Sequence, residues 1–124
     1  MTKHRILYVG IASREAIKRR TIAIAKGELR PGPKEPKVWF TSFESLGKVL
    51  SERNMLLLEM IRSRHPRSVS DLANLSGRKK SNLSRTLANM ERLGLVQLKT
   101  EKNRKVPRVK FDRLMFDYAL DQAA

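Results

Sequence analysis

The stretch "GRKKSNLSRTLANMERLGLV", residues 77–96, decides how the rest of the chain is interpreted. Leu83, Leu87 and Met90 are spaced four and then three residues apart, so a helix would place them on one side. The opposite side would carry only polar side chains: Ser81, Arg85, Asn89 and Arg92. Gly94 is a typical helix stop, and an apolar, strand-like segment follows it. The stretch predicts a helix that is apolar on one side and basic on the other.

The segments on either side of this helix complete a recognisable arrangement. Before it, "SVSDLANLSG" predicts a short helix capped by Ser70 and ended at Gly77. After it, "LVQLKTEKNRKVPRVKF" alternates apolar and polar residues on both sides of 102–105, which is typical of a hairpin. The sequence therefore predicts a helix-turn-helix followed by a β-hairpin wing. A helix fits the major groove of DNA, and a neighbouring hairpin can reach the flanking backbone or minor groove.

The composition favours a nucleic-acid partner. The chain of 124 residues carries 27 Lys+Arg against 12 Asp+Glu, a formal net charge of +15. Residues 62–113 alone hold 15 basic and 4 acidic side chains. Such an excess indicates a polyanion, usually nucleic acid and less often a membrane surface. We expect no membrane partner, because we find no apolar run of transmembrane length.

Other features of the composition concern the compartment. The chain has no cysteine, which excludes disulfides and thiolate metal sites and fits a reducing cytoplasm. A signal peptide is not expected, because "REAIKRR" interrupts the short apolar run near the N-terminus. We therefore expect a cytoplasmic protein.

The remaining segments predict helices around this centre. Residues 5–12 predict a short buried strand or an extended arm, and Ser13 opens a predicted helix that ends near Gly27. "LRPGPKEPK" must be a loop, because proline cannot continue a helix or a central strand. A short extended "VWF", two further helices and a terminal helix in "DRLMFDYAL" follow in the prediction.

The expected fold class is mainly α with a small β-hairpin wing. It has an N-terminal extension over 1–41, a winged helix-turn-helix domain over 42–111 and a C-terminal helix over 112–124.

Residues 51–111 resemble a winged helix-turn-helix of the broad MarR/ArsR type. The "DLA" helix, the "SNLSRTL" recognition helix and the "MERLGLV" closure carry the resemblance. The wider frame, from "YVGIAS" through "AIAKGELRPGP" to "PKVWFTSFESLGKVLSERNMLLLEMI", resembles a family of small predicted prokaryotic transcriptional regulators. That family includes TumA-type antitoxins, which are encoded beside a small toxin. The resemblance implies DNA binding, transcription regulation and, for the antitoxin version, a cognate toxin as a second partner.

The resemblance and the helix faces together predict a set of DNA-binding residues. Lys80, Ser81, Asn82 and Arg85 match the positions that approach bases in winged helices. Arg78 and Lys79 depart from the pattern, because an apolar residue and a Ser or Thr cap usually stand there. The predicted DNA-binding residues are Lys79, Lys80, Ser81, Asn82, Arg85, Asn89, Lys102, Asn103, Arg104 and Lys105.

Our functional prediction is a sequence-specific regulator of double-stranded DNA, a repressor that acts as a homodimer. A dimer is expected because one recognition helix reads few base pairs. The alternative is an antitoxin that neutralises a toxin and regulates its own operon. RNA binding is the third reading. Residues 62–110 contain no aromatic side chain on which bases stack, which counts against single-stranded RNA, whereas double-stranded RNA, recognised by shape, stays an alternative. No catalytic group, cofactor or metal site is expected, since His4 and His65 are the only histidines and have no recognisable ligand spacing.

Overall fold

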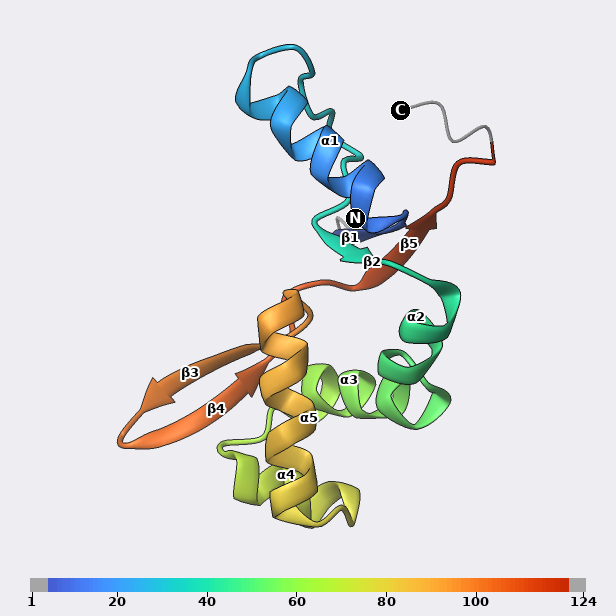
Figure 1. Cartoon of the computed structure of the whole chain (residues 1–124). Coiled ribbons are helices and arrows are strands. Elements are labelled where there is room, and N and C mark those ends of the chain that lie inside the picture. The colour runs from blue at the N-terminus through green and yellow to red at the C-terminus, as the bar shows by residue number, and fades with distance from the viewer. Residues whose placement is uncertain (1–4, 121–124) are drawn as a thin grey trace, which may run out of the picture. The chain divides into compact units, whose positions relative to one another are not determined.

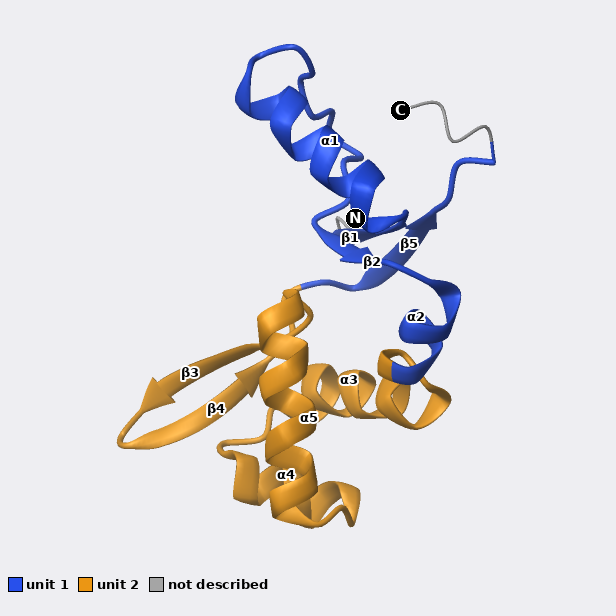
Figure 2. Cartoon of the chain, viewed as in Figure 1, with its two compact units in different colours: residues 1–48, 111–124 blue, residues 49–110 orange. Residues whose placement is uncertain are grey.

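The computed structural model of the chain describes residues 5–120 and divides into two compact units (Figures 1 and 2). The first unit joins both ends of the chain, residues 1–48 and 111–124. The second unit is continuous, residues 49–110. Helix α2 (Phe43–Val49), which the sequence analysis places in 42–111, falls almost entirely in the first unit.

The first unit is built on a small parallel sheet. Strand β1 (Ile6–Ile11) lies in the middle, between β2 (Val38–Phe40) and β5 (Arg113–Asp117). Both pairings are parallel, and helix α1 (Arg14–Ala25) connects β1 to β2. A parallel pair needs such a crossover, because a tight turn can only reverse the chain. The predicted strand at 5–12, the helix after it and the extended "VWF" are confirmed.

A helix cap and a glycine explain the local structure at two points of this unit. The Ser13 hydroxyl accepts a hydrogen bond from the Ala16 N–H at 3.1 Å and caps α1, as the sequence predicts. In β1, Gly10 lies beneath the Trp39 ring, where an added Cβ would come within 2.4 Å of a ring carbon. Only glycine leaves room for Trp39 at this point of the sheet.

The C-terminal helix predicted for 112–124 is wrong in the part that the structure describes. Residues 113–117 form β5, which pairs with β1 from Ile6↔Arg113 to Gly10↔Asp117. A short apolar run such as Leu114–Phe116 suits a helix or a strand equally well by its periodicity. The free edge of β1 decides, because it supplies the hydrogen-bond partners that only a strand can use. Residues 121–124 of the prediction lie outside the described residues.

The second unit contains three helices and a hairpin. The helices are α3 (Glu52–Arg64), α4 (Val69–Ser76) and α5 (Lys80–Leu93), and the strands are β3 (Gln97–Glu101) and β4 (Arg104–Arg108). Strands β3 and β4 pair antiparallel. The predicted element order of this unit is confirmed. The expected fold class, mainly α with a small β-hairpin wing, did not include the three-stranded parallel sheet of the first unit.

Side chains from all parts of this unit form its core. The buried apolar residues of the second unit are Leu50, Leu57, Leu58, Ile61, Leu72, Leu83, Leu87, Met90, Leu95, Val96 and Val106. Leu83, Leu87 and Met90, the predicted apolar ridge of α5, are each 0% exposed. The ridge therefore fixes which side of α5 faces outward.

The start of α4 differs by two residues from the prediction. Ser68, and not Ser70, is the N-cap, and its hydroxyl accepts from the Asp71 N–H at 3.0 Å. The Asp71 carboxylate in turn accepts from the Arg67 N–H at 2.9 Å. A cap at Ser68 is favoured because only this register lets Asp71 return a hydrogen bond, much as in a capping box.

The hairpin reverses at Lys102 and Asn103. Both residues have positive φ angles, 51° and 64°, and Glu101 is paired with Arg104 across the turn. Two consecutive positive φ angles are the signature of the turn that matches the twist of a two-residue hairpin. The predicted hairpin tip is confirmed, and its geometry turns four consecutive polar residues, 102–105, into an exposed end.

Candidate nucleic-acid interface

The outward side of α5 is polar along its length. Lys80, Ser81, Asn82 and Arg85 are exposed, and Asn89 is partly buried. This follows directly from the burial of the ridge on the opposite side. At about 100° per residue, Ser81, Arg85 and Asn82 lie within about 100° of one another around the helix axis, and Lys80 lies about 100° further round from Ser81.

Two arginines on this side are tied to asparagines one turn earlier. Arg85 donates to the Asn82 Oδ1 atom at 3.3 Å, and Arg92 donates to the Asn89 Oδ1 atom. Residues three apart on a helix are neighbours, so these bonds are local and cost little to form. They hold both guanidinium groups along the helix surface, where each retains further N–H donors.

The N-terminus of α5 has no side-chain cap. Lys79 is the N-cap residue and makes no capping hydrogen bond, and no acidic residue lies in the first turn. The first N–H groups of a helix have no partner inside the helix, and the helix dipole adds a partial positive charge there. Lys79 and Lys80 add two full charges at the same end. The combination attracts an anion and repels cations.

Arg78 has an internal position, which sequence reasoning did not assign. Its guanidinium donates to the Asn54 Oδ1 atom at 3.0 Å and to the Thr86 hydroxyl at 3.4 Å, so it links α3 to α5. Burial, together with the nearby charge of Arg53, lowers the pKa of Arg78 from its ordinary value. Its place in the sequence, where winged helices carry an apolar residue, was the available signal.

A groove in the second unit brings the hairpin tip together with two helices. Its lining comes from the start of α4, the exposed side of α5 and the tip between β3 and β4. The lining residues are Ser68, Val69, Ser70, Lys80, Ser84, Asn103, Arg104 and Lys105. Four of these, Lys80, Asn103, Arg104 and Lys105, belong to the predicted DNA-binding set. Sequence reasoning missed Ser68, Ser70 and Ser84, although the pattern of serines at a helix start and on a polar face was visible.

The other predicted residues lie outside this groove. Ser81, Asn82 and Arg85 continue along the outer side of α5, and Asn89 lies further toward its end. Lys79 stands at the helix start and Lys102 at the turn. The structure thus places the set on one helix and one hairpin tip, and joins the two through the groove.

Two contacts hold the hairpin in place. The Glu91 carboxylate accepts from the Leu98 N–H at 3.0 Å and links the end of α5 to β3. Arg108 and Glu101 form an exposed ion pair at 3.2 Å across the two strands. Exposed pairs of this kind contribute little stability, about 0–1 kcal/mol. The Glu91 bond joins the hairpin to the helix.

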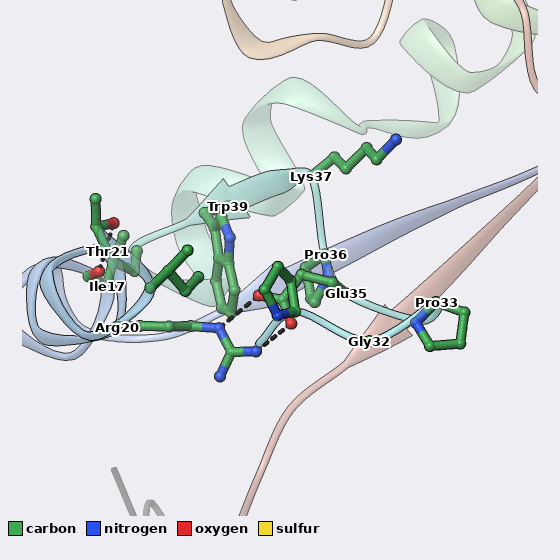
Figure 3. A pocket seen from close by; sticks show the side chains of 11 residues that line it. Ile17, Arg20, Thr21, Gly32, Pro33, Glu35, Pro36, Lys37 and Trp39 are labelled. Atoms are coloured by element: carbon green, nitrogen blue, oxygen red, sulfur yellow. Dashed lines mark hydrogen bonds and ion pairs between the residues drawn. The ribbon is translucent and has the colours of Figure 1, made fainter. Parts of the chain in front are cut away.

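The first unit has a different kind of depression, shown in Figure 3. It lies between α1, the Pro-rich loop and Trp39. Arg20 forms a two-pronged ion pair with Glu35, and its guanidinium carbon lies 5.9 Å from the centre of the Trp39 ring. The hydrogen bond to Glu35 is the largest cause of the raised pKa of Arg20. Because Glu35 already occupies Arg20, this pair fastens the loop to α1.

The described residues were compared with the requirements of a metal site and of a membrane-spanning helix. Within residues 5–120, no group of three or more His, Cys, Asp and Glu side chains is placed to hold a metal ion. In the same part of the chain, no helix combines the length and apolar character needed to cross a membrane.

Comparison with known proteins gives one family and one structure. The chain resembles the crystal structure of a predicted DNA-binding transcriptional regulator from E. coli, with 21% sequence identity and a TM-score of 0.48. That similarity covers 76% of this chain and 84% of the other. None of the curated proteins matches the chain significantly. The HVO_A0114 family model matches residues 49–116, which are more than half of the sequence. The chain therefore belongs to the HVO_A0114 family.

Proposed function

We propose that the protein is a regulator of transcription that binds double-stranded DNA through its second unit, as a winged helix-turn-helix. The observation that carries the proposal is the groove where Lys80 of α5 meets Arg104 and Lys105 of the hairpin tip. Three elements that are separate in the sequence direct cations and hydroxyl groups to one place. A phosphodiester backbone is the common ligand for such a set.

In this proposal α5 lies in the major groove with its uncapped N-terminus near a phosphate. Lys79, Lys80 and the first N–H groups of the helix contact that phosphate. Arg85 reaches a guanine edge with two parallel hydrogen bonds, and Asn82 can pair in the same way with adenine. The buried ridge on the other side keeps these side chains in a fixed register.

The hairpin tip contacts the DNA backbone beside the helix. Lys102, Arg104 and Lys105 are exposed and carry no ion pair with an acidic residue among the described contacts. Ser68 and Ser70 at the start of α4 add hydroxyl donors to the same groove. Contacts to phosphate position a protein on DNA without reading sequence. The division assigns sequence reading to α5 and positioning to the hairpin.

The composition of the second unit supports DNA over single-stranded RNA. Residues 49–110 hold 15 Lys+Arg, 5 Asp+Glu and no aromatic side chain. Single-stranded RNA is bound largely by stacking on aromatic rings, so this composition disfavours it. The proposal includes repression as the mode of regulation. It also includes a homodimer, because a regulator with one short recognition helix needs a second half-site for specificity.

A second candidate, an antitoxin, draws on a different observation. In the first unit Phe43 and Tyr118 are both exposed, and the centres of their rings lie 5.0 Å apart. Exposed apolar groups that are close together favour a protein partner. A toxin encoded by the neighbouring gene would be that partner, and co-purification of the two products tests this version.

Selection of bound fragments from random duplex DNA tests the main proposal. We expect one enriched motif with two related half-sites. The variant Arg85→Ala should lose the preference at one base pair, whereas Lys18→Ala, an equal charge change on α1 of the first unit, should keep the motif unchanged. Absence of any enriched motif, or equal loss in both variants, would contradict sequence reading by α5.

A further inference from the structure

The outer edge of β5 has no partner strand in the part of the chain that the structure describes. The strand order is β2-β1-β5, so β5 is an edge. The Arg113 N–H donates to the Arg5 carbonyl at 3.3 Å, which directs the backbone groups of Arg113 toward β1. Backbone groups alternate along a strand, so those of Leu114 and Phe116 point to the open edge.

The side chains of the same strand are unusually exposed for a parallel sheet. Met115 is 47% exposed and Phe116 is 53% exposed. Strands in parallel sheets are normally covered on both faces, and sheets of three strands lie at the small end of the observed range. The strand therefore has both the backbone groups and the apolar surface that another strand would use.

We propose that β5 pairs antiparallel with β5 of a second copy of the chain, with Met115 on the two-fold axis. In this register Leu114 lies opposite the partner's Phe116, and Phe116 lies opposite the partner's Leu114. These are the residues whose N–H and C=O groups point outward, so both pairs are hydrogen-bonded pairs of the antiparallel ladder. The two small sheets join into one sheet of six strands.

The charges at the ends of the strand favour a second copy in this direction. Arg113 and Asp117 stand at equal distances from Met115, on opposite sides of it. Antiparallel pairing places each Arg113 opposite the partner's Asp117, and the pair occurs twice because a two-fold interface repeats every contact. A parallel arrangement would place like charges side by side. Edge strands that avoid association carry charges that obstruct pairing, whereas these two charges are complementary.

The proposed function includes a homodimer, and β5 is the surface that would form it. The biological role of this dimer therefore rests on the proposed function. The association itself is a property of the first unit. Its test is carried out without DNA, so loss of self-association and loss of DNA binding are separate results.

Charge exchange across the strand is the first test, with dissociation constants measured by sedimentation equilibrium. Arg113→Asp places Asp opposite the partner's Asp117 and should weaken the dimer about tenfold or more. Asp117→Arg should weaken it similarly. The double variant R113D/D117R restores opposite charges and should recover dimerisation. A monomeric wild-type protein, an unaffected Arg113→Asp variant, or a folded double variant that stays monomeric would overturn the proposal.

Cross-linking tests the register without depending on the charge variants. The chain has no cysteine, so Met115→Cys introduces a single thiol. In the proposed register the two Cα atoms at this position lie about 4.5 Å apart, as in a non-hydrogen-bonded pair. Mild oxidation should therefore join two chains through position 115. Leu120→Cys is the control, because Leu120 is 90% exposed but its copies would lie on the order of 30 Å apart. Equal cross-linking of both variants, or none at position 115, would overturn the register.

Discussion

The two units distribute aromatic and charged residues in opposite ways. All seven aromatic residues of the chain lie in the first unit, and none lies in residues 49–110. The second unit carries 15 of the 27 Lys+Arg and only 5 of the 12 Asp+Glu. Among residues 5–120, eight large apolar side chains are exposed, and of these Leu56 alone belongs to the second unit. One chain therefore presents two surfaces with different chemistry.

Each surface suits a different class of partner. A basic surface with short polar side chains attracts phosphate, and its affinity depends strongly on salt. An exposed apolar strand edge suits another protein and depends on shape and backbone pairing. If the second unit alone binds DNA, variants on its basic surface should change DNA affinity. Truncating an apolar side chain in its interior should lower the free energy of unfolding more than truncating an exposed one in the first unit.

Salt should have the largest effect. If six to ten phosphates are neutralised by residues such as Lys80, Lys102, Arg104 and Lys105, DNA affinity should fall by about 10³–10⁵ between 50 and 200 mM salt. Fluorescence anisotropy with a labelled duplex measures this directly. Self-association through β5 should change far less over the same range, because it involves two ion pairs and a backbone ladder instead of six to ten phosphate contacts. A DNA affinity that does not change with salt would contradict phosphate binding by the basic surface.

Core truncation should come next. Leu87 is 0% exposed in the ridge of α5, so Leu87→Ala should lower the free energy of unfolding by about 2–5 kcal/mol. Leu120→Ala, which removes the same atoms from a side chain that is 90% exposed, should change it by less than about 0.5 kcal/mol. Urea denaturation of both variants measures the pair. Similar losses would mean that Leu120 is covered in solution.

Arg85 should account for part of the sequence preference. Arg85→Ala should cost about 1–3 kcal/mol on the preferred site and much less on random DNA. The physical reason is the loss of two parallel hydrogen bonds to a base edge. Competition binding with specific and random duplexes measures the difference. Equal losses on both would assign Arg85 to the backbone instead.

Lys105 should have the smallest effect and a different signature. Lys105→Ala should weaken binding to all sequences alike and lower the salt slope by about one unit. Arg108→Ala is a matched control on the same strand, because Arg108 is ion-paired with Glu101 in the protein. Anisotropy titrations at several salt concentrations resolve the slopes. A change in base preference for Lys105→Ala would contradict a role confined to positioning.

Local patterns in the sequence determined most of the second unit. The spacing of Leu83, Leu87 and Met90 predicts both α5 and its buried side, and the glycine at 94 predicts its end. These signals are local, because a helix forms its hydrogen bonds within one segment. The position of Ser68 as the cap of α4 was missed, although Ser68 and Asp71 stand three residues apart in the capping-box pattern that the sequence displays.

The candidate site was predictable only in its parts. Lys80 and Lys105 are separated by a helix and a strand, and the sequence places each on its own element. Their convergence in one groove, together with Ser68 and Ser84, depends on how α4, α5 and the hairpin pack. The sequence places Arg78 beside the start of α5, and only the packed structure shows that its guanidinium bonds to Asn54 and Thr86.

By itself, the sequence determined the charge of the chain, its helices in the second unit and the hairpin tip, because charge and short-range periodicity are properties of contiguous residues. Only the tertiary structure decided that residues 113–117 form a strand. Their apolar run fits a helix or a strand, and the choice depends on the edge of β1, more than a hundred residues earlier. Strand pairing draws its hydrogen bonds from a distant segment, so no local pattern could specify it.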